Sequence, residues 1–355
     1  MKRTIDKTAI SFKACCTIFD ALIKPVILYA SPIWAMSLAA SKFIGRDPHW
    51  VNTLNSTSLS LDLKLASETI EKVHFKFLKW ALGVHRKASN IGVWGESGRM
   101  PLLYNCIESS LKYYNRLQNL NDNSLVSLAF KEQHSSNLAW KTNILNIIKN
   151  NTNNTLTGNA YTSNNINMIQ PQVNLNVNSI KHILVNLTDK FINCWKLRKS
   201  LSPKLNYYNS VKTEFKRESY LADSKNFKAR SLLTKLRISA HDLNIETGRY
   251  TNTPRDERTC EWCKIVLSTN IVEDELHFLL HCDLYNSHRQ TIIANNHTLN
   301  SSITQVINNV PVTQAFIPAE NNKNYNILLC KLVCKFFDTR EKFLDSNKNA
   351  GSSQN

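Results

Sequence analysis

The sequence predicts a mainly α-helical fold with one small element held together by cysteine and histidine side chains. Apolar residues recur at the three- and four-residue spacing of amphipathic helices in several separate segments. Between Arg255 and Arg289, cysteines and histidines stand at spacings typical of a metal site. Basic residues concentrate just before that segment. Together these observations favour helical regions that flank a compact element stabilised by a bound metal ion.

The composition indicates a cationic protein with enough apolar residues for packed cores. The 355 residues are 42% hydrophobic, carry a net charge of +17 and give an isoelectric point of about 9.5. A charge excess of this size favours a polyanionic partner, nucleic acid first and an anionic membrane second. The nearest approach to a membrane span, residues 26–41, is 16 residues long and contains Pro32, so we expect no membrane association.

Cysteine usage and the N-terminal residues predict an intracellular protein. The chain has nine cysteines, an odd number, and its first residues are not followed by an apolar signal-peptide core. Reduced thiols together with one metal site fit this pattern. We therefore expect the protein in the nucleus or the cytoplasm, and not secreted.

Residues 1–148 are expected to form a helical region that opens with an apolar helix over Thr8–Tyr29. Pro25 and Pro32 would break or restart that helix. From its abrupt start we expect that a domain precedes this region in the parent protein. One face of the helix carries the apolar residues Phe12, Cys15, Cys16, Phe19, Leu22 and Ile23.

A second helix is predicted to begin at Ser67, a suitable N-cap, and to end at Gly83. Its surface is basic, and such a face is either merely solvated or in contact with phosphates. The buried stripe comprises Ile70, Val73, Phe77, Leu78 and Ala81. The candidate phosphate contacts on and after this helix are Lys72, Lys76, Lys79, Arg86 and Lys87.

The next segment, residues 88–101, is rich in glycine, and we expect a turn there that leads into a helix over Leu102–Leu120. No G-K-[ST] sequence accompanies the glycines, so a phosphate-binding loop is not supported. Residues 149–178 are rich in Asn and Thr without apolar periodicity, and they predict a flexible linker.

Residues 179–254 are expected to form a basic helical region. Between residues 181 and 255, sixteen Lys and Arg against six Asp and Glu leave a charge of +10. Backbone contacts to RNA or DNA would release counterions, so binding should weaken steeply with salt. The candidate contacts in and beside this region are Arg217, Lys228, Arg230, Lys235, Arg237, Arg249 and Arg255.

Residues 255–290 contain the strongest local signal, a C-x2-C-x13-H-x4-C arrangement of Cys260, Cys263, His277 and Cys282. Two thiols two residues apart can turn inward from one tight knuckle, and a His/Cys pair on a helix can complete a tetrahedron. The acidic run 273–275 favours a helix N-terminus there. We interpret the set as a structural Zn²⁺ site rather than as chance cysteines beside a core histidine.

The fourth ligand is open at this point. His281 lies four residues after His277 and would give a Cys2His2 set, whereas Cys282 would give three thiolates and one imidazole. Thiolate binds zinc strongly, so we favour Cys282. Beyond the knuckle, residues 291–345 are expected to end in an amphipathic helix carrying Leu328, Leu329, Leu332, Val333 and Phe336, and residues 346–355 to be disordered.

Three segments, in this order, resemble the C-terminal third of the reverse-transcriptase polyprotein of non-LTR (LINE-type) retrotransposons of animals. They are FDALIKPVILYASPIWA, then IEKVHFKFLKWALGV with GESGRMPL, then LRISAHDLNIETGRYTNTPRDERTCEWC followed by VEDELHFLLHCDLY. The resemblance covers most of the chain outside the Asn-rich tract. It implies a helical, thumb-like bundle after the polymerase palm, a basic helical domain, and a terminal zinc knuckle with Cys260, Cys263, His277 and Cys282 at the metal positions.

The departures from this family bear on activity. The paired aspartates that hold Mg²⁺ in such polymerases are absent, and no Pro-Asp sequence of a restriction-like nuclease occurs near the knuckle. We therefore expect a nucleic-acid-binding fragment without polymerase or nuclease activity. One alternative is a decayed or domesticated reading frame with an inert zinc clip. Another is a self-standing zinc enzyme with Glu273 or Glu275 as general base, which four good ligands disfavour because no open position remains.

Overall fold

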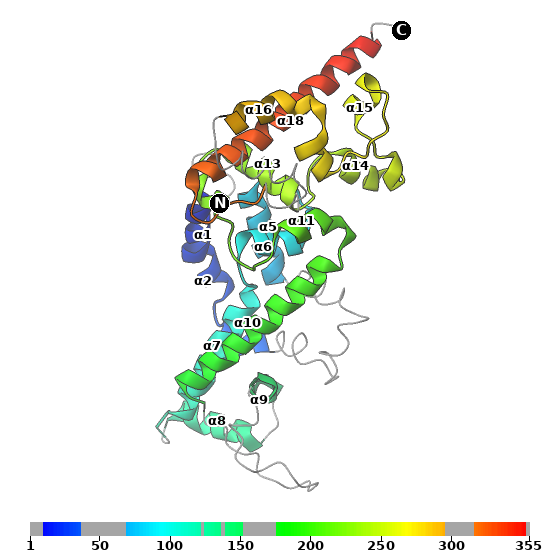
Figure 1. Cartoon of the computed structure of the whole chain (residues 1–355). Helices are drawn as coiled ribbons and strands as arrows, with labels where there is room; N and C mark the ends of the chain where they lie inside the picture. Colours follow the sequence, from blue (N-terminus) through cyan, green and yellow to red (C-terminus); the bar gives the residue numbers. More distant parts are fainter. Residues whose placement is uncertain are drawn as a thin grey trace. The chain divides into compact units, whose positions relative to one another are not determined.

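The computed structural model describes residues 10–36, 69–121, 124–135, 139–151, 175–294 and 316–352, and these residues are mainly helical, as predicted (Figure 1). The described residues contain one isolated antiparallel bridge, between Thr259 and Val272, and no longer strand. The chain divides into two compact units. The first comprises Met1–Phe19, Phe75–Arg99 and Lys199–Asn355, and the second Asp20–His74 and Met100–Arg198.

This division differs from the expected split at the Asn-rich tract, because each unit collects segments from both sides of that tract. Side-chain packing explains the difference. Glu96 forms an ion pair with Arg237, which lies 141 residues further along the chain, and no local sequence pattern predicts such a contact. Residues 152–174, most of the predicted linker, lie outside the described residues; α9 extends to Asn151 and α10 begins at Val177.

The first unit is built from short helices around one long one. Its helices are α1 (Phe12–Ile18), the part of α5 (Thr69–Leu82) from Phe75 on, α6 (Asn90–Ser97), α11 (Asn206–Val211), α12 (Tyr220–Asp223), α13 (Phe227–Arg237), α14 (Asn244–Tyr250), α15 (Glu261–Val266), α16 (Asn286–Ala294) and α18 (Lys323–Ser352). Single turns occur at η5 (Pro203–Leu205), η6 (Arg255–Glu257), η7 (His277–His281) and η8 (Asp283–Tyr285).

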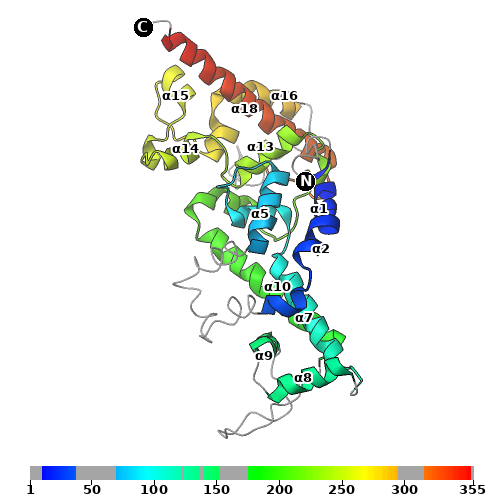
Figure 2. The same ribbon diagram turned by 180° about the vertical axis from the view of Figure 1, so that it is seen from behind.

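The long helix α18 packs against α12, α13 and α16 and carries the core of this unit (Figures 1 and 2). Phe336 is fully buried, and its ring lies 4.8 Å from Tyr285 and 5.7 Å from Phe278, centroid to centroid. Leu329, Leu332 and Val333 are buried as predicted, whereas Leu328 is only half-buried. The helix continues to Ser352, through most of the segment expected to be disordered. That segment is polar, but it contains no proline to end the helix, and the helical backbone continues into it.

The glycine-rich segment 88–101 was predicted to be a turn, and this prediction is wrong, because it forms helix α6. The side chain of Ser89 accepts a hydrogen bond from the amide of Gly92, which starts the helix. Gly98 ends it with a φ of 60°, and a Cβ there would lie 2.1 Å from the backbone nitrogen of Arg217. The glycines therefore serve close packing and a helix C-terminus.

The second unit contains most of η1 (Phe19–Ile23, a π-helix), α2 (Lys24–Ile27), the start of α5, α7 (Leu102–Gln118), α8 (Leu125–Ser135), α9 (Ala139–Asn151) and most of α10 (Val177–Ser200). The side chain of Glu71 accepts a hydrogen bond from the amide of Leu103 and so caps α7. Tyr104 donates from its hydroxyl to the carbonyl of Leu187, 2.9 Å away, which ties α7 to α10.

The predicted apolar stripes hold in part. Phe12, Cys15, Cys16 and Phe19 are buried, but Leu22 is 67% exposed because η1 is a π-helix, whose wider turn shifts the phase of the side chains that follow. In α5 the stripe is buried except for Val73. The predicted cap, Ser67, lies outside the described residues. Gly83 ends the helix with a φ of 73°, as expected of a C′ glycine.

Candidate metal centre

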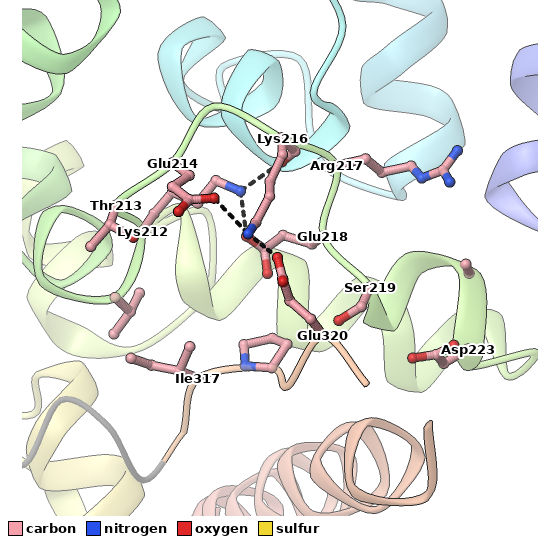
Figure 3. Close-up of a pocket in the computed structure, with 13 residues that line it drawn as sticks. Lys212, Thr213, Glu214, Lys216, Arg217, Glu218, Ser219, Asp223, Ile317 and Glu320 are labelled. Atoms are coloured by element: carbon pink, nitrogen blue, oxygen red, sulfur yellow. Dashed lines mark hydrogen bonds and ion pairs between the residues drawn. The ribbon is translucent and has the colours of Figure 1, made fainter. Parts of the chain in front are cut away.

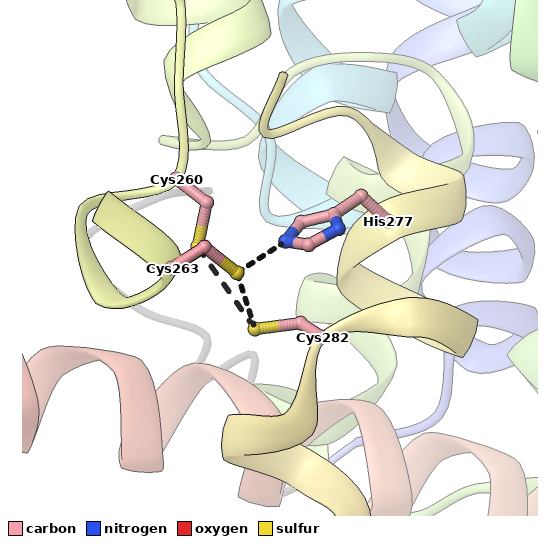
Figure 4. Close-up of side chains that lie close together, drawn as sticks. All are labelled: Cys260, Cys263, His277 and Cys282. Carbon is pink, nitrogen blue, oxygen red and sulfur yellow. Dashed lines mark hydrogen bonds between the residues drawn. The ribbon is translucent and has the colours of Figure 1, made fainter. Parts of the chain in front are cut away.

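Four buried side chains converge in the first unit, and they are the four predicted metal ligands (Figure 4). Sγ of Cys260 lies 3.9 Å from Sγ of Cys282, and Sγ of Cys263 lies 4.0 Å from the same sulfur. Nε2 of His277 lies 3.4 Å from Sγ of Cys263. All four donor atoms fall within 4.8 Å of one another, so a single ion can contact them all.

These separations fit the edges of a coordination tetrahedron. With metal–sulfur bonds of roughly 2.3 Å and metal–nitrogen bonds of roughly 2.0 Å, tetrahedral angles place two sulfurs about 3.8 Å apart and a sulfur and a nitrogen about 3.5 Å apart. Three of the six separations, at 3.9, 4.0 and 3.4 Å, agree closely with these values, and all six lie within 4.8 Å. The four donors are therefore close enough together to bind one metal ion.

The backbone around the two N-terminal cysteines forms a knuckle. Cys260 stands at the N-cap of α15, and Cys263 lies in its first turn. The amide of Cys260 donates to the carbonyl of Ile271 at 2.8 Å, and the amide of Glu273 donates to the carbonyl of Arg258 at 2.8 Å, on either side of the Thr259–Val272 bridge. These bonds close the loop at its base and bring the two cysteines opposite the helix that follows.

His277 and Cys282 are positioned by the π-helix η7. The carboxylate of Asp274 accepts a hydrogen bond from the amide of His277 at 2.8 Å and so caps the helical stretch that begins at residue 275, as the acidic run predicted. The wider turn of a π-helix places residues five apart on one side, so Cys282 faces the same point as His277. Cys282 is fully buried, whereas His281 is exposed and lies outside the cluster. The structure thus favours Cys282 as fourth ligand.

The electrostatics of the cluster favour a cation. A hydrogen bond from Cys282 lowers the pKa of Cys260 to about 4, whereas burial raises the pKa of Cys263 to about 11. The hydrogen bond to Cys260, reinforced by burial, raises the pKa of Cys282 strongly. In the absence of metal, a negative charge on Cys260 therefore disfavours ionisation of the other two thiols. A dication would allow all of them to ionise, as metal-bound thiols do.

Groups around the cluster hold its backbone in place. Arg289 of α16 is 5% exposed and donates to the carbonyl of Leu279 at 3.1 Å and to that of Cys282. Arg340 of α18 forms two hydrogen bonds, of 2.6 and 2.7 Å, with the carboxylate of Glu273. Nδ1 of His277 is buried and has no hydrogen-bond partner among the described residues. The knuckle is thus fixed to both α16 and α18.

The basic residues predicted to contact nucleic acid fall into three groups, which are buried, half-buried and exposed. Arg230 and Arg237 are 1% and 0% exposed, so the prediction that they contact phosphates is wrong. Their side chains point into the protein because α13 is packed between α11 and α18. Lys79, Lys235 and Arg249 are half-buried. The remaining candidates are exposed, namely Lys72, Lys76, Arg86, Lys87, Arg217, Lys228 and Arg255.

Sequence reasoning missed a buried ionic network in the first unit. Arg237 pairs with Glu96 at 3.1 Å and with Glu218 at 3.2 Å, and Glu218 also pairs with Lys212. A second polar feature, a cleft of about 500 Å³, adjoins this network; there Lys216 pairs with Glu214 and Glu320 (Figure 3). These ion pairs join residues distant in sequence or neighbours in one loop, and neither arrangement has a sequence signature.

Comparison with known protein families, with curated proteins and with solved structures finds no match to this chain. Among the described helices, none has the length and apolar content that a bilayer crossing requires. The four converging side chains therefore remain the feature on which a functional interpretation of the chain has to rest.

Proposed function

We propose that the chain is a nucleic-acid-binding protein, related to the C-terminal region of LINE-type reverse transcriptases, that holds a structural Zn²⁺ on Cys260, Cys263, His277 and Cys282. The convergence of these four buried donors carries the proposal. Three sulfurs and one nitrogen at tetrahedral separations are the ligand set that zinc prefers in structural sites. The resemblance of the three sequence segments places the same four residues at the metal positions of that family.

The proposed partner is RNA or DNA, bound mainly through the phosphate backbone. The net charge of +17 and the exposed cations of the first unit, such as Arg86, Arg217 and Arg255, support this choice. Lys and Arg side chains that neutralise phosphates release counterions, which makes binding strong at low salt and weak at high salt. A protein with this role would act in the nucleus or the cytoplasm.

The proposal assigns no catalytic role to the metal. A catalytic zinc keeps an open position and a free general base beside it. Here four protein ligands are available, and both candidate bases are engaged: Glu273 is held by Arg340, and Glu275 accepts hydrogen bonds from Ser239 and His241. The contacts of these carboxylates therefore favour a structural clip over a zinc enzyme.

Metal analysis combined with binding measurements tests the proposal. The purified chain is expected to contain one zinc and to bind single-stranded RNA and duplex DNA with an affinity that falls steeply between low and high salt. Replacing both Arg86 and Arg217 with Ala should weaken binding and reduce the salt slope by about 2. The matched control replaces Lys331 and Lys335 of α18, which are exposed and are not predicted contacts. Zinc without any nucleic-acid binding would instead support an inert clip.

A further inference from the structure

A cleft of about 490 Å³ lies beside the metal knuckle in the first unit. It is lined by Lys204 and Tyr207, by residues of α14, and by Arg255, Arg258 and residues 274–276 of the knuckle. Three of its cations, Lys204, Arg249 and Arg255, come from different segments of the chain. We call it the Glu246 cleft, after the residue that organises it.

Glu246 holds a set of donors at the cleft. Its side chain is 2% exposed, and one carboxylate oxygen accepts hydrogen bonds from the ammonium of Lys204 and, at 3.1 Å, from the hydroxyl of Tyr250. The other oxygen lies 3.1 Å from Nε of Arg249. One buried carboxylate thus fixes two cations and one aromatic ring.

The cations that line the cleft, Lys204, Arg249, Arg255 and Arg258, outnumber its three carboxylates, those of Glu246, Asp274 and Glu275, and further cations lie nearby. Burial, together with the positive charges of Arg86 and Lys204, lowers the pKa of Lys79 to about 8. Burial and the charge of Lys204 likewise lower the pKa of His85. Like charges that crowd together in this way destabilise one another, and a bound anion would relieve the repulsion.

The acidic groups that line the cleft are occupied by protein donors. Asp274 accepts the hydrogen bond from the amide of His277, and Glu275 accepts hydrogen bonds from Ser239 and His241. Arg255, by contrast, is exposed and forms no ion pair among the described residues. Arg255 therefore has its donors available to a ligand, and Lys204 and Arg249, held by Glu246, stand beside it.

Tyr250 adds a stacking surface next to these donors. Its ring is 54% exposed, and Nζ of Lys87 lies 5.5 Å from the ring centroid. The hydroxyl bond to Glu246 restrains the ring. An exposed aromatic ring flanked by cations is the arrangement that proteins use to bind unpaired bases, because every base presents a flat face and every nucleotide a phosphate.

We propose that the Glu246 cleft binds single-stranded nucleic acid, with a base stacked on Tyr250 and the adjoining phosphate held by Lys204, Arg249 and Arg255. This inference rests on the proposed nucleic-acid binding and specifies its ligand. A duplex keeps its bases stacked and paired inside the helix, so it can offer phosphates to the cations but no free base to the ring.

The test compares tyrosine variants of the full, zinc-loaded chain. Fluorescent oligothymidylate and oligouridylate serve as single-stranded probes, and a DNA duplex of matched length as the third. Tyr250→Ala should weaken binding of both single strands by about tenfold, as loss of one base–aromatic stack does, and should leave duplex binding nearly unchanged. Tyr250→Phe keeps the ring and should retain single-strand affinity. Tyr29→Ala is the matched control, because Tyr29 is 82% exposed in the second unit.

A second variant keeps the test decisive if Tyr250→Ala does not fold. Arg255→Ala removes an exposed cation that forms no ion pair with any described residue. It should lower the salt slope for single strands by about 1, whereas Lys331→Ala should not. Wild-type affinity of Tyr250→Ala or of Arg255→Ala, or an equal loss on single strands and duplex, would overturn the single-strand site. Absence of all binding by the wild-type chain would overturn the proposed function itself, a distinguishable result.

Discussion

The amide of Cys282 donates a hydrogen bond to the carbonyl of His277, five residues earlier, across 2.9 Å. This bond defines the π-helix that separates two of the metal ligands. In an α-helix the residue four positions on, His281, would share the face of His277. The wider turn instead directs Cys282 into the cluster and His281 into solvent.

The choice of fourth ligand leads to a prediction about two adjacent substitutions. Cys282→Ser should reduce zinc occupancy and lower the thermal midpoint, because the oxygen of serine is a poor substitute for a thiolate. His281→Ala should leave both unchanged, because its side chain is exposed. Metal content by mass spectrometry and thermal unfolding check the pair. The assignment is wrong if His281→Ala loses zinc while Cys282→Ser keeps it.

Metal removal should unfold the knuckle before the rest of the first unit. Without a cation, the four buried donors keep only their sulfur contacts of 3.4 to 4.0 Å, and residues 264–271, which are exposed throughout, have few side chains to hold them. Chelation should therefore increase amide exchange over residues 260–282 while α13 and α18 stay protected. Hydrogen exchange with and without a chelator measures this. Uniform deprotection of the whole unit would show that the metal organises more than the knuckle.

The pair formed by Glu273 and Arg340 should contribute strongly to stability. The two side chains are 4% and 12% exposed and share two hydrogen bonds, which join the knuckle to α18. Arg340→Ala leaves a buried carboxylate without its cation and should cost about 3–5 kcal/mol in the free energy of unfolding. Denaturant unfolding tests this, with Lys348→Ala on the exposed end of α18 as control. A cost as small as that of the control would contradict the role assigned to the pair.

The sequence predicted those features that depend on residues close to one another in the chain. The metal ligands lie within one short segment, so their spacing alone limits the geometries available to them. The apolar face of α18 follows from helical periodicity in the same way. The helix α6 could not be predicted from its own segment. Its Glu96 is buried through the ion pair with Arg237, which is distant in sequence. Burial of Arg230 and Arg237 likewise depends on tertiary packing, and a basic helix face looks the same whether it is buried or exposed.

The two buried arginines of α13 should respond in opposite ways to replacement by methionine. Arg237→Met leaves Glu96 and Glu218 without their shared cation and should destabilise the first unit by about 3–5 kcal/mol. Arg230 has no carboxylate partner among the described residues, and Nε and Nη2 of its side chain form no hydrogen bond. Burial lowers its pKa, which marks a desolvation cost that methionine would remove. Arg230→Met should therefore be neutral or stabilising.

Denaturant unfolding of both variants measures the contrast between them. Each serves as the control of the other, because the same side chain is replaced on the same helix. Neither substitution removes an exposed charge, so the nucleic-acid affinity of folded protein should stay near that of the wild type. Equal destabilisation by the two substitutions would mean that the carboxylates do not account for the burial of Arg237.

Lys79 should make the stability of the first unit depend on pH. Burial, with the charges of Arg86 and Lys204, lowers its pKa from 10.5 to about 8. Between about pH 8 and pH 10.5 the unfolded chain therefore binds more protons at this side chain than the folded chain does, so this residue's contribution to stability rises with pH across that window. At neutral pH both states are charged, and the folded state bears the full cost of the buried charge.

Lys79→Met removes that cost and should be more stable than wild type at pH 7, with an advantage that shrinks as the pH approaches 10.5. The difference between the two proteins isolates Lys79, because the other titrating groups are common to both. Part of the gain is offset by the lost hydrogen bond from Lys79 to the carbonyl of Arg86, 2.8 Å long, at every pH. Urea unfolding at pH 7, 8.5 and 10 follows the trend. An advantage that grows with pH would have the wrong sign and would place the pKa of Lys79 above its usual value.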